Sequence, residues 1–273
     1  MAIRNPHPPA SLSKAELKHL KALSTKKGRE VAGLFLLDGW KPVAEALASP
    51  WQIESVVVDP GRIPASGASV LQECVRRGVG VRHGTSSDLR SLSDVVHDQG
   101  IVAVVRSRRF ALDDLPSVGD LIVLDAVADP GNVGSLIRTA DWFGMSGVVL
   151  GPGCSSVNNE KVVRATMGSL FHLPVVEVDD LSVACSTLDR KGVILAGAEV
   201  AGGGWRSWVP EARIALVLGS ESHGISAGVR ALLKIRVSIP KAGRAESLNV
   251  AGAGAVLLSS IAEHRKAGLH ATS

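Results

Sequence analysis

The stretch LIVLDAVADPGNVGSLIR, residues 121–138, decides the fold of the second half of this chain. Its first four residues are all apolar, which is typical of a strand in a parallel sheet that is covered on both faces. Asp129-Pro-Gly-Asn132 has the composition of a turn, and the residues after it have the spacing of a helix. The free N–H groups of that helix would face the carboxyl end of the strand, where α/β proteins bind ligands.

Two later segments repeat this arrangement of polar residues after an apolar run. They are Gly219-Ser-Glu-Ser-His-Gly224 and Ile239-Pro through Glu246-Ser-Leu-Asn249. Because the carboxyl ends of parallel strands share one edge of a sheet, three such segments in one domain predict a pocket. The side chains that we expect there are Asn132, Arg138, Glu221, Ser247 and Asn249. Each has a plain alternative: a surface arginine, a solvated loop glutamate, or a residue that simply caps a helix.

The rest of the chain predicts a second, smaller α/β unit before this one. Apolar runs and helical spacing alternate over residues 1–106, residues 107–117 form a charged and Pro-containing linker, and residues 118–273 form the pocket-bearing domain. Further strands are expected at 33–37, 53–58, 79–81, 101–105, 147–150, 174–177 and 193–197. Helices are expected at 13–24, 42–48, 69–77, 88–96, 158–168, 181–190, 226–233 and 247–266.

The charge of the chain is unevenly spread. Residues 1–110 contain 16 basic and 10 acidic residues, whereas residues 111–273 contain 14 and 16. Lys26, Lys27 and Arg29 belong to the basic N-terminal part. A basic part fits a phosphate-rich partner such as RNA, and the alternative is a solvated helix face.

Several classes of protein are disfavoured by the sequence. Its three cysteines are far apart, which argues against a disulfide framework and fits a reducing cytoplasm. No apolar run reaches about 18 residues, so we expect no membrane span and no membrane partner. The histidines lack metal-ligand spacing, so we expect no metal. Gly151-Pro-Gly153 lacks the third glycine of a dinucleotide fingerprint, and no phosphate-binding P-loop is present.

With these residues in view, the chain resembles the SpoU/TrmH family of RNA ribose 2′-O-methyltransferases in the SPOUT superfamily. The three polar segments correspond to the three motifs of that family, in order. The stretch KVVRATMGSLFHLP, residues 161–174, also matches a typical family stretch, and the region around GLFLLDG, residues 33–39, resembles the family's N-terminal domain. One departure is Ser222, which stands where a glycine is commoner.

The resemblance implies an α/β fold whose C-terminal domain contains a deep trefoil knot. It also implies a homodimer through that domain, and a first domain that binds RNA and is similar to a ribosomal-protein fold. The cofactor would be S-adenosylmethionine, held by Gly197, Gly219, Ile239, Ser247 and Leu248. Asn132, Arg138, Glu221, Ser247 and Asn249 would be the catalytic residues. Arg138 and Arg164 would contact RNA, together with the basic residues of the first domain.

The implied reaction is methyl transfer to a ribose 2′-hydroxyl of structured RNA, with ribosomal RNA preferred. Two alternatives stay open. One is the same chemistry on tRNA. The other is an assembly factor that binds RNA and has lost catalysis, against which the intact Arg138, Glu221 and Asn249 argue.

Overall fold

The computed structural model describes residues 10–92, 99–204, 208 and 212–271. The chain divides into two compact units, one of Met1–Arg108 with Asn158–Phe171 and one of Arg109–Val157 with His172–Ser273. The segment Asn158–Phe171 is therefore packed with the first unit, although it follows the first strands of the second in sequence. The boundaries drawn from the sequence at residues 106 and 118 stay predictions.

The first unit is built on a five-stranded sheet of order β1-β4-β3-β5-β2. Its strands are β1 (Ala10–Ser11), β2 (Leu34–Asp38), β3 (Ile53–Val58), β4 (Gly80–His83) and β5 (Ile101–Arg106). β1, β4 and β3 run parallel, and β5 is antiparallel to both its neighbours. Its helices are α1 (Lys14–Ala22), α2 (Lys26–Ala32), α3 (Trp40–Ala48), α4 (Gly67–Arg76), α5 (Ser86–Leu92) and α7 (Glu160–Thr166), with short 3-10 turns η1 (Pro60–Arg62) and η3 (Ser169–Phe171).

Local sequence explains these elements well. Ser13 and Glu16 form the capping box expected at the start of α1, with both reciprocal hydrogen bonds present. One face of the sheet packs on α1 and α5 through buried Leu20, Leu23, Leu89 and Leu92. Residues 93–96 of the predicted helix 88–96 lie outside the described residues.

The second unit is built on a parallel six-stranded sheet of order β11-β9-β10-β6-β7-β8. The strands are β6 (Leu121–Asp125), β7 (Gly147–Leu150), β8 (Val175–Glu177), β9 (Ile194–Gly204), β10 (Ile214–Gly219) and β11 (Ile235–Ser238). The helices are α6 (Pro130–Trp142), α8 (Leu181–Arg190), α9 (Ala227–Arg230) and α10 (Val250–Ala271), with the 3-10 turn η2 (Leu112–Asp114). The prediction of a parallel α/β domain preceded by a smaller α/β domain is confirmed.

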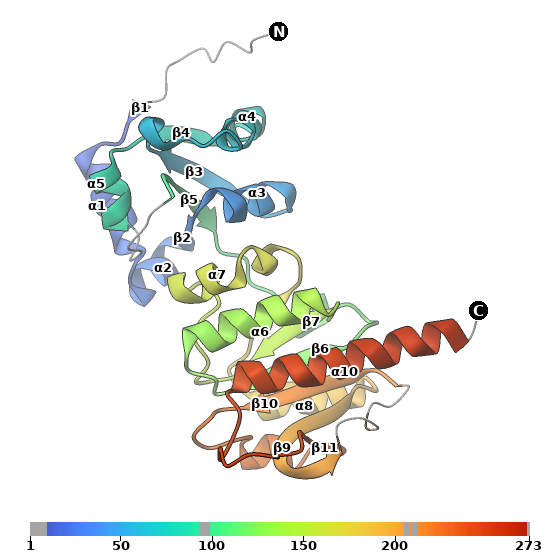
Figure 1. Ribbon diagram of the computed structural model, residues 1–273. Helices are drawn as coiled ribbons and strands as arrows, with labels where there is room; N and C mark the ends of the chain where they lie inside the picture. The colour runs from blue at the N-terminus through green and yellow to red at the C-terminus, as the bar shows by residue number, and fades with distance from the viewer. Residues whose placement is uncertain (1–9, 93–98, 205–207, 209–211, 272–273) are drawn as a thin grey trace. The chain divides into compact units, whose positions relative to one another are not determined.

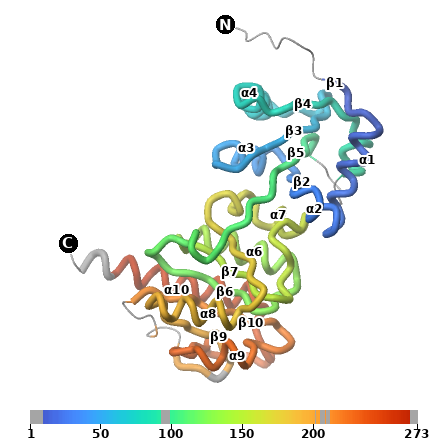
Figure 2. Tube along the Cα trace, turned by 180° about the vertical axis from the view of Figure 1, so that it is seen from behind, coloured from blue at the N-terminus to red at the C-terminus, as the bar shows by residue number. Residues whose placement is uncertain are grey.

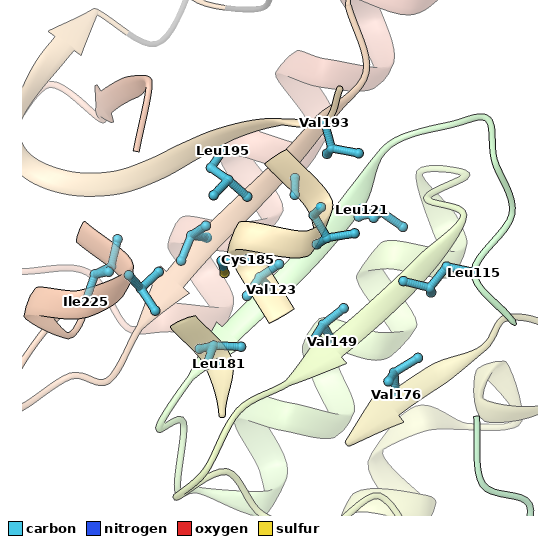
Figure 3. Close-up of a cluster of buried hydrophobic side chains, with 14 residues drawn as sticks. Leu115, Leu121, Val123, Val149, Val176, Leu181, Cys185, Val193, Leu195 and Ile225 are labelled. Carbon is cyan, nitrogen blue, oxygen red and sulfur yellow. The ribbon is translucent and has the colours of Figure 1, made fainter. Parts of the chain in front are cut away.

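Helices cover both faces of this sheet, as the continuous apolar strands predict. α6 and α10 lie side by side on one face (Figure 1). α8 and α9 contact each other on the other face and are seen more directly in Figure 2. Figure 3 shows that Leu181 and Cys185 of α8 pack on Val123 and Val149 of the strands, in a cluster of fully or nearly fully buried side chains.

α10 packs very closely on α6, as its many small residues predict. A Cβ added at Gly254 would lie 2.4 Å from Leu136 Cδ2, so a larger residue here would force that side chain to move. Near its other end, Arg265 donates from Nε to Asp120 Oδ2 at 2.8 Å and from Nη2 to Asp120 Oδ1 at 2.9 Å. Asp120 is only 5% exposed and also accepts a hydrogen bond from the backbone N–H of Ile214. This carboxylate therefore connects α10 to the sheet.

Among the described residues, no helix combines the length and apolar character that a membrane span requires. The same residues contain no group of three or more His, Cys, Asp or Glu side chains that could hold a metal ion.

Candidate functional site

The three polar segments of the second unit meet at the carboxyl end of its sheet. The first begins α6, whose N-cap is Asp129 with Pro130 in the first turn, and Asp129 Oδ1 accepts from the N–H of Asn132 at 2.8 Å. The second follows β10, and the third follows β11 and leads into α10. The three segments thus meet through hydrogen bonds, and the second and third of them line a cavity, whereas no residue of the first lines it.

One side chain from each segment enters a single hydrogen-bond network. Asn132 donates from Nδ2 to Glu221 Oε1 at 2.5 Å, and Asn249 donates from Nδ2 to Asn132 Oδ1 at 3.1 Å. An ionised carboxylate can only accept, so Glu221 fixes which end of the Asn132 amide faces it. The Asn132 oxygen is then left to accept from Asn249. Asn249 in turn accepts from the N–H of Ala251 at 2.9 Å and so caps α10.

A cavity of about 860 Å³ opens beside this network. Glu221 joins the network to the cavity, because it lines the cavity as well as bonding to Asn132. Gly219, Ile239, Ser247 and Leu248, all predicted to bind a cofactor, also line it.

Gly197, the fifth residue predicted to bind a cofactor, does not line the cavity. It is buried in β9, where an added Cβ would lie 2.4 Å from Leu233 Cδ1. Gly197 could therefore affect a cofactor site only indirectly, by letting β9 pack closely against Leu233.

Arg138 lies six residues along α6 from Asn132, about 9 Å at the usual helical rise. Its side chain is exposed, and among the described residues it has no hydrogen-bond or ion-pair partner. Its guanidinium is therefore available to an anionic ligand rather than committed to the fold.

The loop after β10 is a tight turn that leaves no room beside Gly219. Ser220 and Gly224 form an isolated bridge, and the Gly224 N–H donates to Ser220 O at 2.8 Å. A Cβ added at Gly219 would lie 2.2 Å from the Gly224 carbonyl carbon. Gly224 itself has a positive φ of 66°. Both glycines are thus required for the backbone to pass close to the cavity.

The predicted RNA-contacting residues of the first unit differ in exposure. Lys26 and Lys27 are exposed on α2, and Arg164 of α7 is one-third exposed and donates to Glu160 Oε1 at 3.2 Å. Arg29 is only 8% exposed and donates from Nη1 to the carbonyls of Leu23 and Ser24. Burial lowers the pKa of its guanidinium. Arg29 therefore holds the turn between α1 and α2, and its contact with RNA stays a prediction that this burial does not support.

Sequence reasoning missed three charged residues of the cavity wall, namely Glu199, Arg230 and Arg236. Arg230 Nε donates to Glu199 Oε1 at 2.6 Å, and Arg236 Nε lies 3.5 Å from Glu199 Oε2. A signal for Glu199 was present, because it follows the apolar run of β9 just as the three polar segments follow their strands.

Comparison with known proteins agrees with this geometry. Residues 120–259 match the family model of the SpoU rRNA Methylase family, and residues 14–103 match the model of the MRM3-like substrate binding domain. The chain is 33% identical over 250 residues to the 23S rRNA (guanosine(2553)-2′-O)-methyltransferase RlmP of Bacillus subtilis, covering 91% of this chain and 96% of that protein. It is 29% identical over 270 residues to the 23S rRNA (uridine(2479)-2′-O)-methyltransferase of Streptomyces viridochromogenes, covering 92% and 90%.

Solved structures give the same result. The SpoU methyltransferase AviRb of Streptomyces viridochromogenes, in complex with the cofactor AdoMet, is 28% identical with a TM-score of 0.83, covering 93% of this chain and 98% of that one. The AdoMet-bound rRNA methyltransferase of Sinorhizobium meliloti is 28% identical with a TM-score of 0.82, covering 93% and 97%. The family model spans more than half of the chain, and the three segments that match the family's motifs build one site. This chain belongs to the SpoU rRNA methylase family.

Proposed function

We propose that this protein transfers a methyl group from S-adenosylmethionine to a ribose 2′-hydroxyl of ribosomal RNA. The observation that carries the proposal is the network of Asn132, Glu221 and Asn249 beside the cavity of about 860 Å³. It unites the three family motifs in one place, next to a space large enough for a cofactor and part of a substrate.

The cavity suits S-adenosylmethionine. Apolar side chains on its wall include Leu218, Val237, Leu248 and Val250, which fit the faces of an adenine ring. Gly219 keeps the backbone beside it free of any side chain, so main-chain groups can approach a ligand. When bound, the cofactor would supply a methyl group on a positively charged sulfur. The residues of the protein would position the ribose and the methyl group and stabilise the charge that develops on the attacking oxygen.

Gly219→Ala is expected to lower the affinity for S-adenosylhomocysteine, the demethylated cofactor, by about tenfold or more. The added Cβ overlaps the backbone of Gly224, so the loop must move out of its cavity position. Isothermal titration calorimetry measures the affinity. Gly243→Ala is a matched control, because Gly243 also lines the cavity but has no atom within 4 Å of an added Cβ. Equal binding by the two variants would contradict the assignment of Gly219.

Arg138 is the residue that we assign to the RNA at the reacting centre. A guanidinium has a pKa above about 12 and rarely gives up its proton, so we infer that Arg138 binds a phosphate and stabilises charge on the attacking oxygen. Removal of the hydroxyl proton by Arg138 itself is the alternative. Asn132, Glu221, Ser247 and Asn249 would hold the backbone and the ribose in line with the methyl group.

Ribosomal RNA is favoured over tRNA because the two named relatives above act on 23S rRNA. We propose that the first unit binds this RNA through phosphate contacts, with Lys26, Lys27 and Arg164 among the contacting residues. Binding through phosphates weakens steeply with salt, because counterions are released when the complex forms. An affinity for rRNA fragments that does not change between low and high salt would contradict this role.

We further propose that the protein is a cytoplasmic homodimer through its second unit. Trp142 at the end of α6 is 82% exposed, and Ala255, Val256 and Ser259 of the neighbouring α10 are only partly covered. A large exposed indole on a helix that packs on α10 fits an interface, where tryptophan is enriched. Sedimentation equilibrium should give twice the 28.4 kDa mass of one chain. The trefoil knot stays a prediction.

The function is tested by methyl transfer to RNA from a strain that lacks the gene. Total RNA is incubated with the protein and tritium-labelled S-adenosylmethionine, and the label is mapped to a nucleotide. We expect label on the 2′-oxygen of one 23S rRNA nucleotide. Label in tRNA would favour the alternative substrate, and S-adenosylhomocysteine binding without any transfer would favour the RNA-binding assembly factor.

A further inference from the structure

A half-buried carboxylate in the cavity wall, that of Glu199, is not part of the three-segment network. Glu199 lines the cavity and is 13% exposed in its side chain, whereas its partners Arg230 and Arg236 are 46% and 55% exposed. The acid is thus the inner group of the cluster, and the two guanidinium groups lie on its outer side. Burying a carboxylate is costly unless it is paired, and these two arginines provide the pairing.

Glu199 keeps hydrogen-bonding capacity that the chain does not use. A carboxylate offers about four acceptor positions. Arg230 occupies one on Oε1 at 2.6 Å, and Arg236 is an ion pair at 3.5 Å rather than a close hydrogen bond. No described residue donates a hydrogen bond to Oε2. Because Glu199 lines the cavity, its open acceptor positions fit a ligand that carries hydroxyl donors.

The backbone around Glu199 is shaped to place it there. β9 and β11 change register, because Arg236 pairs with Gly197 while Val237 pairs with Gly203. The intervening residues 198–202 therefore bulge out of the strand, and Glu199 belongs to this bulge. An added Cβ at Gly202 would lie 2.7 Å from the Val237 carbonyl carbon, so the return to pairing needs glycine. Bulges of this kind redirect side chains next to active sites.

We propose that Glu199 accepts hydrogen bonds from the ribose hydroxyls of the cofactor's adenosyl group, with Arg230 and Arg236 as positioning residues that hold it. The inference rests on the proposed function, since it needs an adenosyl ligand in the cavity. The chemistry is that of dinucleotide sites, where an acidic residue beyond the end of a strand binds a ribose diol. Glu199 thereby selects a ribonucleoside over a deoxynucleoside.

The test compares adenosine with 2′-deoxyadenosine and 3′-deoxyadenosine as displacers of labelled S-adenosylhomocysteine. The wild type should prefer adenosine over at least one deoxynucleoside by about 10- to 100-fold, the range for a hydrogen bond to a charged group. Glu199→Gln should reduce this preference to below about threefold, because the neutral amide accepts more weakly. Glu246→Gln is the matched control, because Glu246 also lines the cavity but is exposed.

Other outcomes overturn the proposal in distinguishable ways. Equal binding of all three nucleosides by the wild type would exclude ribose recognition. A uniform loss in Glu199→Gln with the preference unchanged would leave Glu199 as a structural ion-pair partner only. If Arg230→Ala weakens S-adenosylhomocysteine but spares 5′-methylthioadenosine, which lacks the amino-acid part, the cluster binds the cofactor's carboxylate instead. If the folded wild type binds no S-adenosylhomocysteine, the proposed function itself fails.

Discussion

Arg138→Ala should abolish most methyl transfer while leaving the fold and cofactor binding unchanged. Removing one preorganised group that stabilises charge in a transition state typically lowers kcat by about 100- to 1,000-fold. Arg138 is exposed and unpartnered among the described residues, so its removal leaves no buried group unsatisfied. Initial rates with rRNA, thermal melting and S-adenosylhomocysteine titration together measure the three properties.

Two further variants make the Arg138 result specific. Arg190→Ala removes an exposed arginine from α8, on the opposite face of the sheet, and should retain wild-type turnover. Arg138→Lys separates the two roles of Arg138. A lysine keeps the charge and should restore part of the rate if the residue binds phosphate. If Arg138 were the base, the lysine variant would instead show a rate whose pH dependence shifts down toward the lower pKa of an amine. Near-wild-type turnover of Arg138→Ala would exclude both roles.

Asp120→Ala should be among the most destabilising single substitutions in the second unit. Asp120 is 5% exposed and accepts two hydrogen bonds from Arg265 and one from the Ile214 N–H. The hydrogen bonds with Asp120 raise the pKa of the Arg265 guanidinium. Removing one partner of a buried pair costs about 3–5 kcal/mol, and the partial exposure of Arg265 places the expected loss near the lower end. Urea unfolding measures it.

The control for Asp120 is an ion pair of the same kind on the surface. Asp113 is 2.6 Å from Lys191 but its side chain is 89% exposed, so Asp113→Ala should cost less than about 1 kcal/mol. Replacing Arg265 by Met in the Asp120→Ala background should recover part of the lost stability, since it removes the unpaired charge. Equal losses for Asp120→Ala and Asp113→Ala would show that α10 is held by its apolar contacts alone.

Local sequence predicted most elements because their signals are local. The Ser13 and Glu16 capping box marks the start of α1, and the apolar runs mark the strands of the second unit. α2 was missed because its seven residues, KKGREVA, contain a glycine and too few apolar side chains for a recognisable spacing. The bulge of β9 was missed because the glycines of residues 202–204 carry no pattern that fixes a register.

The site was predictable to the extent that its polar residues follow apolar runs in the sequence. That pattern found Asn132, Glu221 and Asn249, which come after β6, β10 and β11, and would have found Glu199, which follows the apolar first residues of β9. It could not predict the ion pairs of Arg230 and Arg236 with Glu199, because a single sequence carries no pattern that indicates which distant residues are in contact. Nor could charge alone distinguish exposed Lys26 from Arg29, whose guanidinium is turned inward onto two carbonyls.

The network of Asn132, Glu221 and Asn249 also has a consequence for the order in which the protein folds. Its bonds join residues that are 89 and 117 positions apart in the chain. Contacts between such distant residues form slowly, because long loops must close before any bond rewards them. The cofactor site should therefore be a late product of folding, and a refolding chain should regain its secondary structure before it regains ligand binding.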